Sequence, residues 1–259
     1  MGRPLALLTN DDGVDALGLQ SLRRALVLQA DVVVVAPAYQ RSACSHAVTL
    51  HRAMHPVRQA QGVFAIDGTP ADCVYIALHQ GHFFSRAPDV VVSGINHGPN
   101  LGDDIYYSGT VAGAREGALR GIPGIAFSMD GDRDFDAAAA LAARIAHRLL
   151  ETKLPDGPAP LLNVNFPSGS SKGVRATRLG RRVYREPVVT EYDDAAGREY
   201  YTVGGYPHHE ECEGSDTQAL EQGYASVTPL VVEATNPDHL AVAAYVALEP
   251  DPRHGGRDE

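Results

Sequence analysis

The chain has 259 residues, of which 44% are hydrophobic and 21% are charged, a composition that can bury a sizeable core and differs from that of disordered chains. This length favours one large domain over two. The formal net charge of −10 repels polyanions, which argues against a general surface for nucleic acid or anionic lipid. We therefore expect one globular domain over residues 1–259, with neither nucleic acid nor membrane as a partner.

Cysteine usage and the lack of long apolar runs indicate the compartment. The three cysteines are odd in number, widely separated and free of any CxxC pair, which fits neither a disulfide framework nor a zinc site. The apolar stretch near the N-terminus is too short for a signal peptide, and no run approaches the length of a membrane span. We expect a cytoplasmic protein.

The first half of the chain alternates short apolar runs with stretches of helical periodicity. Strands are predicted at 5–9, 31–36, 64–67, 88–93, 122–128 and 161–165, and helices at 18–29, 70–81, 110–119 and 135–153. Thr69 and Asp72 match a capping box at the start of the second helix. This alternation predicts an α/β fold, a Rossmann-like, doubly wound and mostly parallel sheet covered by helices on both faces.

The character of the chain changes from about Ser168 onward. Glycine, proline, tyrosine and arginine become frequent, helical periodicity is lost until Asp216, and paired strand-like runs such as REYYTVG appear. After a catalytic core at 1–167 we expect an extended region at 168–250, built of β-hairpins or an arm, that packs on another subunit. The last residues, 251–259, are expected to form a flexible tail.

The first predicted strand ends in the segment Asn10–Gly13, which holds two adjacent carboxylates, Asp11 and Asp12. In a parallel sheet, ligands bind beyond the carboxyl ends of the strands. Two neighbouring carboxylates share a proton or bind a cation, and hard oxygen donors suit Mg²⁺, Mn²⁺ or Ca²⁺. Asn, Asp and Gly are also the usual turn formers, so a plain turn is an equal alternative for this segment taken alone.

Two further loops leave the same predicted edge. Ser42 follows the second strand, and the segment 93–117 is rich in glycine and includes Asn96 and Asn100. It enters a helix at 108–110, the triplet Ser-Gly-Thr, where free backbone N–H groups and the helix dipole can bind phosphate. The competing interpretation is that Ser108 is only the N-cap and that the glycines serve turns.

The convergence of three loops on one edge is harder to explain by turn chemistry. It predicts a divalent metal beside a phosphate site, the arrangement of metal-assisted phosphoryl hydrolysis. In such a site the ion polarises a phosphoryl oxygen and lowers the pKa of a bound water.

The sequence also resembles the SurE survival-protein family of nucleotidases. The resemblance is carried by TNDDG at 9–13, APxxxxS at 36–42, GTPADC at 68–73, SGINxGxNLGDDxxYSGTVAGAREG at 93–117 and GYASVTPL at 223–230. These motifs occur in the family's order and span nearly the whole chain, so the match is highly specific.

The resemblance implies a ligand set and an activity. It implies that one divalent ion per subunit, Mg²⁺ or Mn²⁺, is held by Asp11, Asp12, Ser42 and Asn96, and that phosphate is bound by Asn100, Ser108, Gly109 and Thr110. The implied reaction is dephosphorylation of nucleoside monophosphates, commonly 5′, in some members 3′, and in some extending to short polyphosphate. Family members form homodimers or homotetramers through the C-terminal half.

Two points stay open after this comparison. Asp11 and Asp12 are the predicted catalytic residues, but the sequence leaves open which acts as general base, or whether one attacks covalently. The chain also departs from many relatives at Ala43, where they carry glycine, and at Leu17, where they carry proline. Neither change removes an oxygen donor, so the departures bear on substrate preference more than on activity.

Other residue clusters have weaker chemical interpretations. The run His208–Glu213 is dense in metal-binding side chains, but adjacent ligands diverge and lack a spaced partner, so we expect a solvated loop. His97 is a candidate general acid, although a histidine in such a loop more often shapes the pocket. Asp103 and Asp104 are expected to orient the loop by accepting hydrogen bonds from backbone N–H groups.

The same motifs argue against three other classes of phosphate-binding protein. A signalling receiver domain needs an aspartate after the third parallel strand and a lysine after the fifth, and neither is in place. A haloacid-dehalogenase phosphatase needs DxDx(T/V), and a P-loop nucleotidase needs GxxxxGK(S/T); both motifs are absent. A catalytically silent nucleotide sensor on the same scaffold stays open until hydrolysis is assayed.

Overall fold

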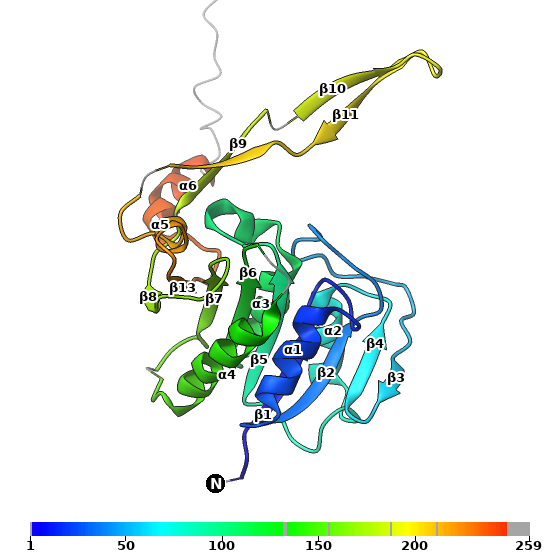
Figure 1. Cartoon of the computed structure of the whole chain (residues 1–259), viewed down its shortest axis with the longest axis vertical. Coiled ribbons are helices and arrows are strands. Elements are labelled where there is room, and N and C mark those ends of the chain that lie inside the picture. The colour runs from blue at the N-terminus through cyan, green and yellow to red at the C-terminus, as the bar shows by residue number, and fades with distance from the viewer. Residues whose placement is uncertain (1, 132–133, 155, 187, 211, 248–259) are drawn as a thin grey trace, which may run out of the picture.

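Helices cover both faces of one large sheet in the computed structural model of the chain (Figure 1). The structure describes residues 2–131, 134–154, 156–186, 188–210 and 212–247. The sheet has nine strands in the order β3 (Val57–Ala60), β4 (Val63–Ile66), β2 (Asp31–Pro37), β1 (Leu5–Thr9), β5 (Val90–His97), β6 (Gly124–Met129), β7 (Leu161–Phe166), β13 (Ala225–Leu230) and β8 (Val174–Ala176).

The central strands of this sheet are parallel. β4, β2, β1, β5, β6 and β7 run in one direction, whereas β3 pairs antiparallel with β4 and β13 antiparallel with β7. Leu7, Val34, Val92 and Ile125 are fully buried, as expected for strands covered on both faces. The predicted mostly parallel, doubly wound sheet is confirmed.

Four helices build the two covering layers. α1 (Leu17–Leu26) and α4 (Phe135–Glu151) lie side by side on one face, and α2 (Pro70–His79) and α3 (Gly109–Leu119) cover the other (Figure 1). The capping box of α2 is confirmed, because Thr69 Oγ1 accepts from the N–H of Asp72 at 3.1 Å and the Asp72 carboxylate accepts from the N–H of Thr69 at 2.9 Å.

Several predicted boundaries are corrected by the structure. The strand expected at 88–93 continues as β5 to His97, and the helix expected at 18–29 ends at Leu26. The antiparallel strand β3 and the C-terminal helix α6 (Leu240–Ala247) were not predicted. β3 is short and exposed, and α6 buries none of its residues, so neither carries the alternation of buried and exposed positions on which such predictions depend.

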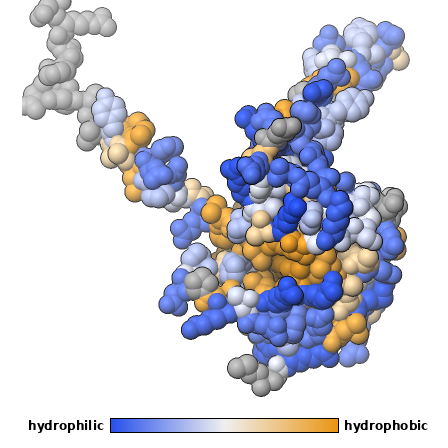
Figure 2. Space-filling model, turned by 60° about the vertical axis from the view of Figure 1, so that its left-hand side comes forward, coloured by the Kyte–Doolittle hydropathy of each residue, from blue (hydrophilic) through white to orange (hydrophobic). Residues whose placement is uncertain are grey.

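The C-terminal third contains the expected hairpins. β9 (Arg181–Arg185) pairs with β12 (Tyr206–Glu210), and β10 (Val188–Asp193) pairs with β11 (Arg198–Val203) to form an arm that projects from the body. Figure 2 shows that the arm and α6 both stand out from the molecule and expose hydrophobic residues. The exposed hydrophobic residues of the two segments are Val188, Val189, Tyr192, Tyr200, Tyr201, Val203, Leu240, Val242, Tyr245 and Val246.

Part of the C-terminal region returns to the main sheet. The short helix α5 (Asp216–Glu221) leads into β13, which lies between β7 and β8. The predicted tail at 251–259 lies outside the described residues. In the part of the chain that the structure describes, no helix is both long and apolar enough to cross a membrane.

Candidate active site

The predicted site lies where the sheet order reverses. β1 pairs with β2 on one side and with β5 on the other, so the chain leaves the carboxyl ends of β1 and β5 in opposite directions. Such a switch point opens a crevice that binds ligands in α/β folds. The loop after β2 also lies at this edge, because the N–H of Arg41 donates to the carbonyl of Asp11 at 2.6 Å. The predicted convergence of three loops is observed.

A cavity of about 690 Å³ opens at this point. Of the predicted residues, it is lined by Asp11, Ser42, Asn96, Asn100 and Ser108. Asp12 instead lines a smaller adjoining hollow, together with His97 and Gln40, and His97 borders both. Gly109 and Thr110 are buried and do not line the cavity.

Asp11 is enclosed beneath the N-terminus of α3. Only 4% of the residue is exposed, and the hydroxyl of Thr110 donates a hydrogen bond to its carboxylate. Burial raises the pKa of Asp11 to about 6, partly offset by the Thr110 hydrogen bond and reinforced by the nearby charge of Asp12. The role of Thr110 seen here is therefore to hold a carboxylate.

Gly109 is required at this position by the closeness of its neighbours. A Cβ atom there would lie 2.7 Å from Cys44 Sγ and 3.0 Å from an Asp11 carboxylate oxygen. The close packing of helix and carboxylate therefore depends on a residue without a side chain.

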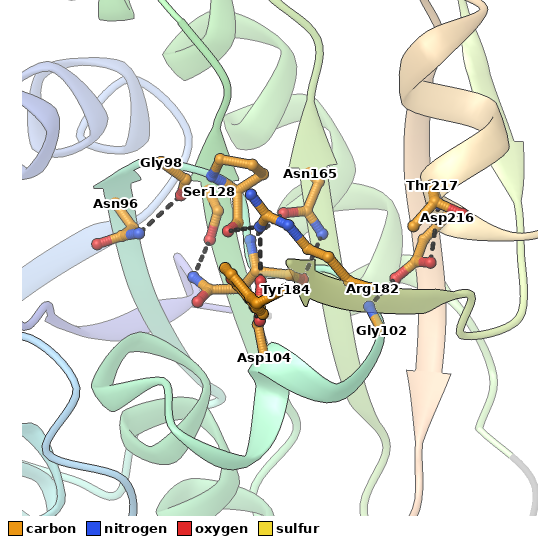
Figure 3. Close-up of polar contacts among 12 residues, drawn as sticks. Asn96, Gly98, Gly102, Asp104, Ser128, Asn165, Arg182, Tyr184, Asp216 and Thr217 are labelled. Atoms are coloured by element: carbon orange, nitrogen blue, oxygen red, sulfur yellow. Dashed lines mark hydrogen bonds and ion pairs between the residues drawn. The ribbon is translucent and has the colours of Figure 1, made fainter. Parts of the chain in front are cut away.

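The remaining predicted metal ligands are oxygen donors with few protein partners. Asp12 accepts from the N–H of His97 at 3.1 Å, and Ser42 Oγ accepts from Gln40 at 3.0 Å. The Asn96 side chain donates its N–H to the carbonyl of Gly98 at 2.7 Å, which leaves its amide oxygen as an acceptor (Figure 3). Carboxylate, hydroxyl and amide oxygens form a donor set suited to a hard divalent cation.

The described residues offer no alternative metal site built from histidine, cysteine or a cluster of carboxylates. Within residues 2–247, apart from the few positions the structure leaves undescribed, no three or more His, Cys, Asp or Glu side chains gather in a way that could hold a metal ion. Only two of the four predicted ligands are carboxylates, so the predicted set does not depend on such a cluster.

Asn100 is held by a network that the sequence reasoning missed. Its N–H donates to Asn165 Oδ1 at 2.7 Å, and its carbonyl accepts from Asn163 and Asn165 at 2.8 and 3.0 Å. Its side-chain amide donates to Ser128 Oγ at 2.7 Å (Figure 3). The signal was present in LLNVNF, where two asparagines interrupt an apolar run and both are buried in the strand that it forms.

Ser108 combines the two roles that were weighed for it. Its hydroxyl accepts from the N–H of Val111 at 3.1 Å as the N-cap of α3, and the residue also lines the cavity. The N–H of Ser108 donates to the carbonyl of Asp104 at 3.1 Å. The helix start is therefore connected to the loop that precedes it.

The C-terminal region supplies one wall of the cavity. Arg182 and Tyr184 of β9 line it, as do Val203 and Gly204 at the end of the arm. Asp104 orients its loop as expected, but it accepts from the side chains of Arg182 and Tyr184. Nothing in the local sequence linked residues that lie so far apart in the chain.

The expectation for the run His208–Glu213 is corrected in part by its position. His208, His209 and Glu210 belong to β12, so the solvated loop expected at 208–213 is corrected to a strand over its first three residues. Neighbouring side chains of a strand point to opposite faces, which keeps these residues from forming one ligand cluster. Glu211 lies outside the described residues.

Of the two departures from the family motifs, one has a backbone consequence. Ala43, where many relatives carry glycine, has a φ of 54°, in the left-handed region that favours glycine. Leu17, the other departure, is the first residue of α1 and lines the adjoining hollow. Both departures thus border the site without supplying a donor.

Comparison with known proteins agrees with this geometry. A family model described as survival protein SurE matches residues 6–186. A protein of Sorangium cellulosum named 5′-nucleotidase SurE is 53% identical over 251 residues, covering 95% of this chain and 97% of the relative, and one of Syntrophotalea carbinolica with the same name is 46% identical over 237 residues, covering 90% and 93%.

A solved structure shows the same fold over nearly the full length. The crystal structure of the SurE protein from Aquifex aeolicus superposes with a TM-score of 0.82 at 38% identity, covering 94% of this chain and 99% of that one. The family model, the curated relatives and this structure agree with the resemblance carried by the sequence motifs. The chain belongs to the SurE survival-protein family.

Proposed function

We propose that the protein hydrolyses nucleoside 5′-monophosphates to nucleoside and phosphate and that it requires a divalent cation. The chain is a phosphoric monoester hydrolase of the 5′-nucleotidase class, the name that its curated relatives carry. The observation that supports the proposal best is one cavity lined both by the oxygen donors Asp11, Ser42 and Asn96 and by Asn100 and Ser108 at the start of α3.

The donor set fits one hard divalent ion, Mg²⁺ or Mn²⁺. Asp11, Asp12, Ser42 and Asn96 would hold it, since their oxygens are the ligand type that such ions prefer. A cation bound there would polarise a phosphoryl oxygen and activate a water for attack. Burial disfavours the ionised form of Asp11 and raises its pKa, and a cation bound beside it would stabilise that ionised form.

The phosphate is proposed to lie against the N-terminus of α3. The N–H groups at Gly109 and Thr110 belong to the first turn of the helix, where backbone donors lack partners within the helix and the dipole favours an anion. Asn100, in the loop that leads into α3, completes this binding site and is held by Ser128, Asn163 and Asn165.

The cavity suits a substrate with an apolar portion. Its volume lies in the usual range for sites that enclose small molecules. Tyr107, Tyr184 and Val203 also line it, and they provide surface for a nucleoside. We also propose 3′-monophosphates and short polyphosphate as further substrates to be compared in the same assay.

The assembly and location of the protein are proposed on separate grounds. Hydrophobic residues exposed on the arm and α6 support self-association into a homodimer or homotetramer through the C-terminal region. The three cysteines are free thiols, which supports a reducing compartment and hence the cytoplasm.

Phosphate release from a panel of 5′- and 3′-monophosphates and short polyphosphate tests the proposal. The purified protein is assayed with Mg²⁺ or Mn²⁺, and with EDTA as the control. We expect release from nucleoside 5′-monophosphates that depends on added metal. Absence of release from every substrate under all metal conditions would favour the silent nucleotide sensor instead.

A further inference from the structure

Strand β9 brings a cationic side chain to the wall of the proposed active site. Arg182 is the only lysine or arginine among the described residues that line the cavity, whereas Asp11 and Asp104 contribute carboxylates. A phosphomonoester entering this cavity carries negative charge and therefore needs positive charge from its surroundings. The first turn of α3 meets part of this need, and Arg182 lies across the same cavity.

The guanidinium of Arg182 is held in place by the loop that carries the phosphate-binding residues. Its Nη1 lies 2.5 Å from an Asp104 carboxylate oxygen and 3.4 Å from the carbonyl of Pro99. Tyr184 donates to the other Asp104 oxygen at 2.9 Å (Figure 3). Pro99 precedes Asn100, and the carbonyl of Asp104 accepts from the N–H of Ser108.

These contacts leave one end of the guanidinium without a protein partner. Nε is enclosed and makes no hydrogen bond among the described residues. Nη2 likewise has no hydrogen-bond partner among them. Unlike Nε it is not enclosed, so it remains accessible. Arg182 lines the cavity and 13% of its side chain is exposed, so the guanidinium is fixed at Nη1 and keeps an accessible donor at Nη2.

We propose that Arg182 is a substrate-binding residue whose Nη2 donates a charge-assisted hydrogen bond to the phosphoryl group of the bound phosphomonoester, and to the phosphate released from it. The inference rests on the proposed function and extends it, because it assigns part of phosphate recognition to the C-terminal region. The parallel-sheet core then holds the metal ligands, and β9 supplies the opposing positive charge.

Binding of inorganic phosphate is the measurement closest to this role. Isothermal titration of the full-length protein in Mn²⁺ gives the phosphate affinity, and a separate titration gives the Mn²⁺ affinity. Steady-state kinetics with adenosine 5′-monophosphate give KM and kcat. The variants are Arg182→Gln and Arg182→Lys. In both, Asp104 keeps its hydrogen bond from Tyr184, so the loop retains an anchor.

The neighbouring arginine provides a matched control. Arg181 lies on the same strand, but its side chain is 69% exposed and pairs with Glu210 at 3.6 Å, outside the cavity. Arg181→Gln removes the same charge from an adjacent position. This variant therefore reproduces any long-range effect of net charge or of strand stability. It does not remove the proposed contact between Arg182 and phosphate.

The expected result is a loss of phosphate affinity specific to position 182. Arg182→Gln should weaken phosphate binding and raise KM by about 10- to 100-fold, the effect of losing a hydrogen bond to a charged group. Arg182→Lys should lose less because it keeps the charge. The Mn²⁺ affinity of both, and all properties of Arg181→Gln, should stay within about twofold of the original protein.

Two outcomes would overturn the assignment. One is a phosphate affinity of Arg182→Gln within about twofold of the original. The other is an equal loss of phosphate and Mn²⁺ affinity in both Arg182 variants, which would mean that Arg182 only positions the loop. Should Arg182→Gln fail to fold, as judged by circular dichroism, Arg182→Lys compared with Arg181→Lys decides the question by the same phosphate titration.

The two proposals fail separately in this design. An original protein that binds phosphate through Arg182 but hydrolyses no phosphomonoester would overturn the proposed function and leave the anion contact intact. An active protein whose phosphate affinity is unchanged in Arg182→Gln would overturn the anion contact and leave the proposed function intact.

Discussion

His46 Nε2 lies 2.8 Å from a carboxylate oxygen of Glu116, and this contact joins a loop of the site to helix α3. His46 belongs to the loop that carries Ser42, and Glu116 belongs to α3, whose first turn is the proposed phosphate site. Glu116 also accepts from Arg120 at 2.8 Å and is only 2% exposed. The pair therefore fixes the proposed metal loop relative to the phosphate-binding helix.

The Glu116 pair predicts a pH-dependent contribution to stability. Burial raises the pKa of Glu116, but the hydrogen bonds from His46 and Arg120 outweigh it and hold the pKa below its usual value of 4.5. A carboxyl with a lowered folded pKa stabilises the protein above its unfolded pKa, and that stabilisation is lost as pH falls through the folded pKa. Glu116→Gln should therefore lower the free energy of unfolding at pH 7 by about 1–3 kcal/mol.

Urea unfolding of the original protein and the variant at pH 7 and at pH 4 and below measures this difference. The difference in the free energy of unfolding between the original protein and Glu116→Gln should become smaller at the lower pH values. Glu151→Gln is a matched control, since Glu151 pairs with His147 at 3.2 Å on the surface with 66% of its side chain exposed. It should change stability by less than about 1 kcal/mol. A gap for Glu116→Gln that is constant with pH would contradict the role of its charge.

Loss of one proposed metal ligand should abolish hydrolysis without unfolding the protein. Asp12 is partly exposed and its carboxylate has one backbone partner, the N–H of His97, so Asp12→Asn should fold normally. We expect p-nitrophenyl phosphate hydrolysis to fall at least about 100-fold, since a ligand contributes no less than its supporting residues. Asp15→Asn, an exposed aspartate of the same loop, should retain full activity. Retained activity in Asp12→Asn would sink the ligand assignment.

A methyl group at Gly109 should disturb the site from inside the protein. The added Cβ would lie 2.7 Å from Cys44 Sγ and 2.9 Å from Asp11 Cβ, so one of the two must move. Overpacking of this kind costs about 1–3 kcal/mol, and we expect Gly109→Ala to lower the free energy of unfolding by that amount and to reduce activity. Chemical denaturation and the phosphatase assay measure the two effects.

Gly81→Ala is the control for this substitution. No atom lies within 4 Å of its added Cβ, and its backbone is not in the left-handed region. It should therefore leave activity and stability nearly unchanged. Equal behaviour of the two alanine variants would show that the α3 N-terminus tolerates displacement from Asp11.

Shortening the arm should reduce the size of the assembly. Replacing 189–202 by a two-residue turn removes most of the exposed tyrosines and valines of β10 and β11 but keeps Val203 and Gly204 at the cavity. Light scattering coupled to size-exclusion chromatography should then show a smaller oligomer for the shortened variant than for the full-length protein. An unchanged mass would place the proposed association surface elsewhere, with α6 as the next candidate.

Much of the fold could be predicted because its signals are local. Buried parallel strands are continuous apolar runs, so β1 and β2 were located to within one residue. The capping box of α2 was visible as TPAD, because its two partners are three residues apart. The helix α6 escaped prediction since its exposed apolar residues lack the stripe that a packed helix shows.

By itself, the sequence determined the family, the parallel sheet and the order of the oxygen-bearing loops, since these depend on residue types at short spacing. Only the tertiary structure decided that Asn163 and Asn165 hold Asn100, that His46 meets Glu116, and that Arg182 borders the same cavity as Asp11. Each of these arrangements brings together residues more than 60 positions apart in the chain. No local pattern encodes them, because chain packing sets which distant side chains meet.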